Sequence, residues 1–463
     1  MVYSVNHINY TNYNTVAKVK SNNNNTGATV SHPALYASAP SFTASQNVST
    51  IRTSLSGKEE KQKYSELLKH VDKATKKQIE QLLKTGVLLN SNSNDKSTVL
   101  DNLYIMATTP RANGLSQSGL IKDTVSTLAH PYNITQQFGD IPNKYRQRAI
   151  DANTQDKSNY VDTYVAHNDI DVKYSGTCVA ASIEFNLAKK MPAEFARFAQ
   201  GLSSEKMAVE KTIKTNNLAD NTLDAVWLLN AFEIPFEMKD FNEAKLTFAP
   251  DKNAIIRAQI QTTDKDPYER TPLDVLMQST FMQVGSQQSY NTLTDKRHGK
   301  FNQNDKGLIE FEKTFTESVV EDKNKLSVTY QTVDDNARLI GYETDRATMK
   351  RHLTTALDMG ENVIIGYTQV DRNNIIINGH EITIVGYKQQ QNGKLIFICN
   401  DTDDNLSQPI EYDEDYLLPK IHHAALPESV VAKDLNITPN WVEGLNLYKK
   451  MKAEHDTTNF TKQ

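Results

Sequence analysis

The sequence predicts an α+β fold, with amphipathic helices dominating the first half of the chain and β-strands the second. In the run 64–83, apolar residues recur at three- and four-residue spacings, which is typical of a helix that buries one face. Three β-rich runs follow at 361–370, 380–388 and 394–400, and turn signals separate them. The QNG that precedes the last run is a hairpin signal, so we expect antiparallel pairing.

Shifts in composition divide the chain into four parts. Residues 1–50 are rich in Asn, Ser and Thr and cannot bury enough apolar surface, so we expect a disordered tail. Residues 51–139 form a helical N-terminal region, 140–430 the main unit with an insertion around 233–340, and 431–463 a C-terminal helix and tail. Further helices are expected at 98–110, 119–130, 191–202, 221–234 with Asn221 as its cap, and 345–360.

Charge and cysteine content exclude several classes of protein. A net charge of −5 gives no basic footprint for nucleic acid. The two cysteines build no disulfide framework, and without a C-x-x-C pair they build no cysteine zinc site, so we expect no metal and no cofactor. No signal peptide and no membrane-spanning run is readable, which makes the cytoplasm the default location and leaves export by another route open.

Cys178 lies where the turn SGT becomes the apolar helical run of KYSGTCVAASIEFNLAKK. A helix N-terminus favours the thiolate form of a cysteine, which is the form that attacks a carbonyl. Ser175, Gly176 and Thr177 are expected to form the turn and to supply capping side chains. The structural alternative is a small buried core cysteine, as we expect for Cys399 in the apolar run LIFIC.

A base for such a thiol is available in NGHEITIVGYK, where His380 opens a predicted strand. The imidazole also needs an oxygen that fixes its orientation, and either Asn400 or Asp401 could supply it where KLIFIC ends. The acidic turn NDTDDN lacks the length and terminal Glu of a calcium loop. The remaining histidines of interest are expected to be surface or hydrogen-bonded residues: His167, His298, His352, His422 and His423.

These three stretches resemble the motifs of papain-family cysteine peptidases. SGTCVAAS is similar to the nucleophile motif, GHEITIVGY to the catalytic-histidine strand, and FICND to the strand that ends in the orienting Asn. The resemblance implies a papain-like two-lobe fold with Cys178, His380 and Asn400 as catalytic residues and Asp401 as the alternative orienting residue. It also implies that 51–139 is an inhibitory prosegment, although the typical prosegment motif is absent and an adaptor is an alternative.

The chain departs from the family pattern at several positions. Val172 stands where the family has the Gln that completes the oxyanion hole, so the second donor is open between Gln155 and Asn168. Val179 replaces the aromatic residue after the cysteine, and Asp401 stands where a Trp is expected.

Three functions are consistent with this pattern. The first is a peptide-bond hydrolase that acts on a peptide or protein through an acyl-enzyme intermediate. The second is a transglutaminase- or amidase-like acyl transferase, in which Asp401 would be the third residue. The third is a catalytically inactive interaction protein on the papain fold. The sequence leaves the oligomeric state open.

Overall fold

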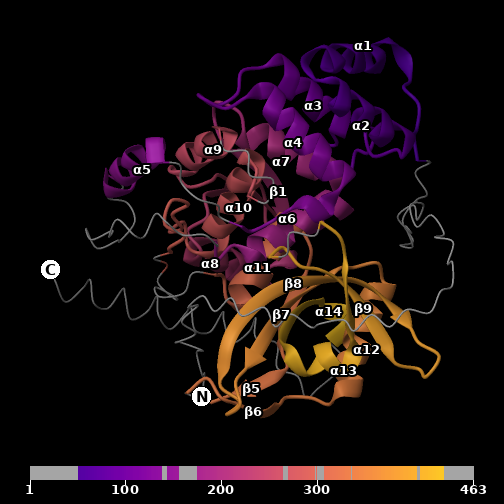
Figure 1. The fold of residues 1–463 in the computed structure, drawn as a ribbon, viewed down its shortest axis with the longest axis vertical. Helices are drawn as coiled ribbons and strands as arrows, with labels where there is room; N and C mark the ends of the chain where they lie inside the picture. Colours follow the sequence, from indigo (N-terminus) through magenta and orange to yellow (C-terminus); the bar gives the residue numbers. More distant parts are fainter. Residues whose placement is uncertain are drawn as a thin grey trace, which may run out of the picture.

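The computed structural model describes residues 51–137, 143–155, 175–263, 269–297, 299, 307–334, 336–403 and 407–431. Over these ranges, helices combine with antiparallel sheets, so the predicted α+β class is confirmed. Helices make up the upper part of Figure 1, and a large curved sheet lies below them. The expected tail over 1–50 lies outside the described residues, as does the expected C-terminal segment beyond residue 431.

The N-terminal helical group comprises α1 (Gly57–Leu67), α2 (Lys73–Lys84), α3 (Val99–Thr108) and α4 (Gln117–Ala129), with short 3-10 turns at Leu68–His70 and Pro131–Asn133. The single helix expected over 64–83 is wrong, because Asp72 starts a second helix by accepting a hydrogen bond from the Thr75 N–H at 2.7 Å. Gly86 follows α2 with a φ of 79°, a conformation that glycine adopts without strain. The two later helices expected in this region are confirmed as α3 and α4.

The central helices are α6 (Cys178–Lys190), α7 (Pro192–Leu202), α10 (Pro272–Gly285) and α11 (Glu310–Glu321). Almost every residue of α6 and α10 is buried, as expected for helices covered on several sides. Around them lie α5 (Asn143–Gln155), α8 (Thr222–Ala231), α9 (Ala254–Thr263), a 3-10 turn (Thr215–Asn217) and a small antiparallel sheet of β1 (Val209–Lys214), β3 (Glu243–Phe248) and β2 (Phe236–Met238). Asn221 caps α8 as predicted, accepting from the Asp224 N–H at 2.9 Å.

One hydrophobic core joins the N-terminal group to the central helices. It includes Leu67 of α1, Leu103 of α3, Phe198 of α7 and Phe315 of α11. The N-terminal region therefore shares its core with the helix that carries Cys178. The region expected to hold an insertion supplies α10 and α11, which both contact α6, so it is part of the same core.

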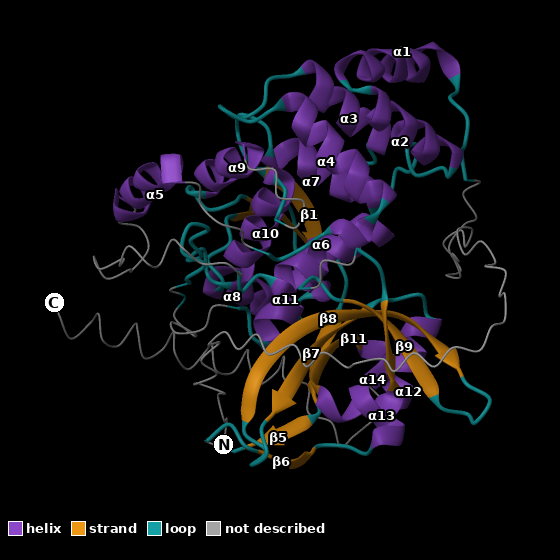
Figure 2. Cartoon of the chain, viewed as in Figure 1, coloured by secondary structure: helices purple, strands orange, loops and turns teal. Residues whose placement is uncertain are grey.

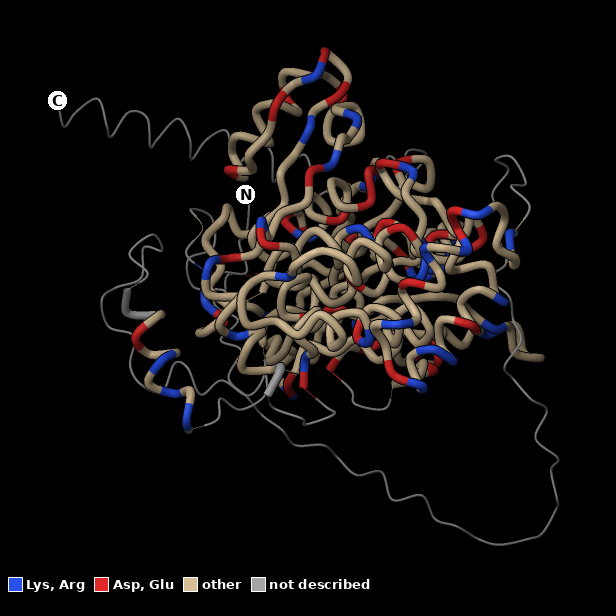
Figure 3. Tube along the Cα trace, turned by 90° about the horizontal axis from the view of Figure 1, so that it is seen from above, with Lys and Arg blue, Asp and Glu red and all other residues tan. Residues whose placement is uncertain are grey.

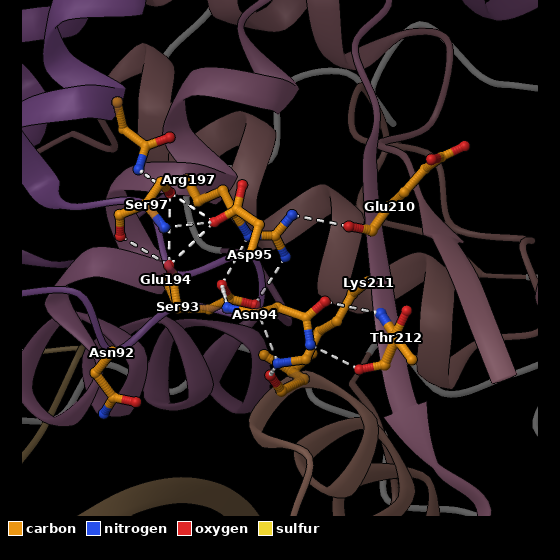
Figure 4. A network of polar contacts seen from close by, with 12 residues as sticks. Asn92, Ser93, Asn94, Asp95, Ser97, Glu194, Arg197, Glu210, Lys211 and Thr212 are labelled. Atoms are coloured by element: carbon orange, nitrogen blue, oxygen red, sulfur yellow. Dashed lines mark hydrogen bonds and ion pairs between the residues drawn. The ribbon is translucent and has the colours of Figure 1, made fainter. Parts of the chain in front are cut away.

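A loop between α2 and α3 anchors the N-terminal group through partly buried polar contacts (Figure 4). The Asn94 N–H donates to Glu194 Oε2 at 2.9 Å, and the Asn94 side-chain amide exchanges two hydrogen bonds with the backbone of Thr212. Burial alone would raise the pKa of Glu194, but Arg197 at 2.7 Å and Lys211 at 3.1 Å bring it to about 2. This carboxylate thus remains charged and holds the two parts of the helical region together.

The large sheet has the strand order β10-β9-β8-β7-β11-β4, and every neighbouring pair is antiparallel. Its strands are β4 (Lys325–Thr329), β7 (Val363–Val370), β8 (Ile376–Gln389), β9 (Leu395–Asn400), β10 (Ile410–Asp413) and β11 (Ile421–Pro427). The three predicted β-runs are confirmed as β7, β8 and β9, and the QNG turn connects β8 to β9 with Gly393 at a φ of 81°. A separate hairpin pairs β5 (Gln331–Val333) with β6 (Leu339–Tyr342).

The two faces of this sheet are covered by different helices (Figure 2). One face packs on α12 (Arg346–Asp358), the predicted helix at 345–360, and on the short helices α13 (Glu414–Leu417), α14 (Glu428–Val431) and the 3-10 turn Leu418–Lys420. The other face meets α6 and α11. Alternation along β7 divides its side chains accordingly, with Ile364 in the core shared with α11 and Ile365 in the core shared with α12.

Basic and acidic residues are interspersed along the chain in Figure 3, as its small net charge suggests. Within the described ranges, no helix combines the length and the hydrophobicity that crossing a membrane requires.

Candidate active site

Cys178 is the first residue of α6, and its side chain is half-buried, whereas Val179 to Ala188 behind it are buried. The thiol thus lies at the accessible end of a rigid helix. No side-chain cap is present at this helix N-terminus, contrary to our expectation for Ser175 and Thr177. No flanking side chain therefore accepts a hydrogen bond from the first backbone N–H groups of α6. These N–H groups can donate to another acceptor.

Ser175 and Thr177 hold the turn in place instead of capping the helix. The Ser175 hydroxyl donates to the carbonyl oxygen of Gln136 at 2.5 Å, and the Thr177 hydroxyl donates to Gln278 Oε1 at 2.8 Å. The Gly176 N–H donates to the carboxylate of Asp295. The turn before Cys178 is thus held by α10, by the loop after α10 and by the end of the N-terminal group.

His380 lies within β8, opposite Tyr367 of β7, and does not open the strand as we expected. Its Nε2 is 2.6 Å from Asp401 Oδ1, and the two side chains are only 13% and 16% exposed. Cys178 is also a neighbour of this imidazole, and its presence raises the pKa of His380. Because Nε2 is used by Asp401, Nδ1 is the ring nitrogen that remains for the thiol.

The electrostatics of this group favour an imidazolium. Burial alone would lower the pKa of His380, but the charge of Asp401, its hydrogen bond and the interaction with Cys178 raise that pKa well above its usual value. Burial would likewise raise the pKa of Asp401, yet the interaction with His380 holds it below its usual value. A positive ring next to a thiol stabilises the thiolate, which is the nucleophilic form.

The structure places Asp401, the alternative orienting residue, against the His380 ring, and not Asn400. Asn400 is the last residue of β9 and pairs with Thr383 of β8. Because it is still part of the sheet, the alternation of side chains along the strand fixes the face on which its side chain lies. It is 2% exposed, and its Nδ2 has no hydrogen-bond partner among the described residues. Asp401 lies beyond the strand end, where the Asp403 N–H donates to its Oδ1 at 3.0 Å and helps direct the carboxylate toward His380.

The segment from Ile134 to Gln137 was not recognised from the sequence as part of the site. The Gln136 N–H donates to the Thr402 carbonyl at 2.9 Å, and the Gln136 carbonyl accepts from Ser175. This segment therefore connects the turn before Cys178 to the loop after Asp401. The sequence gives no sign of this role, because the three segments are far apart along the chain and meet only through tertiary packing.

Gln136 is also a candidate for the second oxyanion donor. Its side chain is 5% exposed, and its Oε1 has no hydrogen-bond partner within the described part of the chain. Of the two donors considered from the sequence, Asn168 lies outside the described residues, and so does the side chain of Gln155 at the end of α5. Val172, at the position of the family's Gln, is outside them as well.

A buried carboxyl lies in α6 itself, between Cys178 and the C-terminal end of the helix. Gln278 donates through Nε2 to Glu184 of α6 at 3.0 Å, and the Glu184 side chain is fully buried. Burial, followed by the neighbouring Asp274, raises the pKa of Glu184 well above its usual value. Its environment therefore disfavours a negative charge on Glu184.

The other candidate residues are not brought to this site. Cys399 is fully buried in the core on the α12 face, and burial raises its pKa, as expected for an inert thiol. His352 is buried and its Nδ1 is 3.0 Å from the Tyr330 hydroxyl. His167 and His298 lie outside the described residues, as does part of the acidic turn NDTDDN. His422 and His423, expected to be ordinary histidines, form a separate cluster with Glu310.

Comparison with protein-family models, with curated proteins and with solved structures gave no match to this chain. The papain-like interpretation therefore depends on the motifs and on the geometry described above.

Proposed function

We propose that the chain is a cysteine-dependent hydrolase that cleaves an amide bond in a peptide or protein. The observation that carries the proposal is the position of His380, whose Nε2 lies 2.6 Å from Asp401 Oδ1 and whose pKa is raised by Asp401 and by its neighbour Cys178. A thiol at a helix N-terminus, a base and an oriented carboxylate are the parts that nucleophilic acyl transfer requires. The likeness of the three motifs to papain-family peptidases supports the same reaction class.

In this proposal, the Cys178 thiolate attacks the carbonyl carbon and forms a sulfur–carbon bond. The backbone N–H groups at the start of α6 stabilise the oxyanion, with the Gln136 side chain as second donor. The His380 imidazolium gives its proton to the leaving nitrogen as the carbon–nitrogen bond breaks. The neutral imidazole then takes a proton from water as the water oxygen attacks the thioester. The sulfur–carbon bond breaks, the acid is released, and the Cys178 thiolate and the His380 imidazolium are restored. Asp401 keeps the His380 ring in place throughout.

A second candidate is a transglutaminase- or amidase-like acyl transferase, and the identity of the orienting residue favours it. In that arrangement the residue after the strand is an aspartate, and here Asp401 contacts His380. The first half-reaction is the same, but a primary amine replaces water as the acceptor. Incubation of the enzyme with glutamine-containing protein, with and without a primary amine, separates the two by mass spectrometry. Transfer releases ammonia from the glutamine amide and puts the amine in its place, whereas hydrolysis puts the hydroxyl of water there.

The experiment that tests the shared proposal is labelling with a vinyl-sulfone or epoxide inactivator, followed by peptide mapping. We expect one adduct, at Cys178, and no adduct at Cys399, which serves as an internal control within the same chain. Cys178→Ala should abolish labelling. If Cys178 reacts with iodoacetamide at pH 6 no faster than a free thiol in a peptide, the chain is instead an inactive interaction protein.

A further inference from the structure

A second cluster of histidine and carboxylate side chains lies between α11 and the face of the large sheet that α11 covers. A row of residues on adjacent strands faces α11, with Glu381 of β8 opposite Gly366 of β7, and Gly366 opposite His423 of β11. Residues that are directly opposite in an antiparallel sheet share one face. A Cβ at Gly366 would come within 2.2 Å of the His423 ring, so the glycine leaves the space in which that ring lies.

His422 reaches the same face through an irregularity in the strand. Consecutive residues on a strand normally point to opposite faces. The pairing of β11 with β7 shifts register between Ile421 and His423, so His422 is an extra residue opposite the same stretch of β7. Ile421 and Ala424 on either side both belong to the core on the other face of the sheet. The bulge therefore directs two successive imidazoles toward α11, and bulges commonly serve to re-aim side chains in this way.

Three ligand atoms converge at this point. The Nδ1 atoms of His422 and His423 are 3.2 Å apart, and Glu310 Oε1 is 2.9 Å from the first and 4.0 Å from the second. In a tetrahedral zinc site with bonds of about 2.0–2.1 Å, neighbouring ligand atoms are ~3.3 Å apart. The three atoms thus have nearly the spacing of one face of such a tetrahedron, and a small rotation of the Glu310 carboxylate would complete it.

The other polar contacts of these residues involve different atoms, so the three converging atoms can bind a metal ion. The other nitrogen of His423, Nε2, lies 3.0 Å from Glu381 Oε1 at ion-pair distance, without the geometry of a hydrogen bond. Thr329 donates to the second carboxylate oxygen of Glu310, Oε2, at 3.0 Å. Lys313 lies 3.3 Å from Glu381 Oε2, so its charge is paired with a carboxylate that is not one of the three converging groups. A carboxylate behind a ligating histidine and a hydroxyl behind a ligating carboxylate are the usual supports of a metal site.

We propose that Glu310, His422 and His423 form a binding site for one divalent metal ion of the zinc class, with the fourth position open to water. Two imidazole nitrogens and one carboxylate oxygen are a donor set that suits zinc better than calcium or magnesium, which prefer oxygen ligands. The ion would link α11 to β11. Its effect is to stabilise the half of the molecule that carries His380, since Glu381 is the next residue on β8 and supports His423.

The test uses the full chain with Cys178→Ala, so that the thiol of the candidate active site binds no metal. After treatment with a chelator, the protein is titrated with zinc chloride, and bound zinc is measured by equilibrium dialysis and elemental analysis. We expect one zinc per chain and a higher melting temperature in its presence. Glu310→Gln and His422→Gln should each weaken binding at least about tenfold to a hundredfold, because loss of a ligand exceeds the loss of a supporting contact. His130→Gln, at an exposed histidine after α4, is the matched control and should bind as the parent does.

Glu310→Gln keeps the size and the hydrogen-bond acceptor of the side chain, so we expect the variant to fold. Circular dichroism of the zinc-free proteins checks this. Replacement of zinc by cobalt adds a direct readout, because visible absorption typical of a tetrahedral ion should appear in the parent and be lost in both variants. Absence of stoichiometric zinc, or equal affinity in parent and variants, would mean that the cluster is a hydrogen-bonded network only and would overturn the proposal. Neither result depends on the reaction proposed for Cys178.

Discussion

Replacing Asp401 by Asn tests the central contact of the candidate active site. The side chain keeps its size but loses the charge that, together with the hydrogen bond at 2.6 Å, raises the pKa of His380. A hydrogen bond to a charged group contributes about 1.5–3 kcal/mol, and both side chains are largely shielded from water, so this range applies with little discount for solvent. One pKa unit corresponds to about 1.36 kcal/mol, so loss of this contact should destabilise the His380 imidazolium by the equivalent of about 1 to 2 pH units and leave less of it to stabilise a thiolate.

The assay for this change requires no substrate. The rate of iodoacetamide alkylation at Cys178, followed by peptide mapping between pH 4 and 9, reports the thiolate directly. We expect the profile of Asp401→Asn to shift to higher pH, and its rate at pH 6 to fall about tenfold to a hundredfold. Asp403→Asn removes a carboxylate from the same loop without touching His380 and is the matched control, while Asn400→Ala tests the residue favoured by the sequence. Superimposable profiles of Asp401→Asn and the unmodified chain, or an equal shift in Asn400→Ala, would refute the assignment of Asp401.

Four further outcomes are expected. With any substrate found, the alkaline limb of kcat/KM should lie above pH 6.5, because Asp401 raises the pKa of His380, and Asp401→Asn should move that limb downward. Gln136→Ala should lower kcat by about a hundredfold to a thousandfold if its amide binds the oxyanion, whereas Gln137→Ala should have little effect. Cys399→Ala should lower the free energy of unfolding in urea by about 0.5–3 kcal/mol and leave alkylation of Cys178 unchanged. Deleting 51–139 should lower both stability and Cys178 reactivity, since that region shares the central core and supplies Gln136; a more reactive truncated chain would instead support an inhibitory prosegment.

The outcome of the deletion depends on how the N-terminal group meets the rest of the molecule. A detachable prosegment would be expected to leave the site intact on removal. Here the Gln136 backbone bridges Ser175 and Thr402, and Asn94 is bonded to the buried carboxylate of Glu194. The N-terminal group is thus an integral support of the candidate active site.

Local patterns in the sequence determined the elements and two members of the candidate site. The α3, α4, α8 and α12 helices and the β7, β8 and β9 strands follow from periodicity, capping residues and turn signals, which act over a few neighbouring positions. The same local chemistry singled out Cys178 at a helix start and His380 on a strand. Asp72 shows where such reasoning fails within a single run, because an apolar spacing that continues across a cap conceals the break between two helices.

Tertiary structure alone decided the rest. Asn400 and Asp401 are adjacent in sequence, and only the end of β9 and the turn after it determine which of them faces His380. Gln136 comes into contact with the loops on both sides of the site through packing between distant segments. His422 and His423 would point to opposite faces of a regular strand, and the bulge in β11 brings them together. These placements depend on strand ends, on strand register and on packing between distant segments. Long-range contacts determine all three, and they leave no short pattern in the sequence.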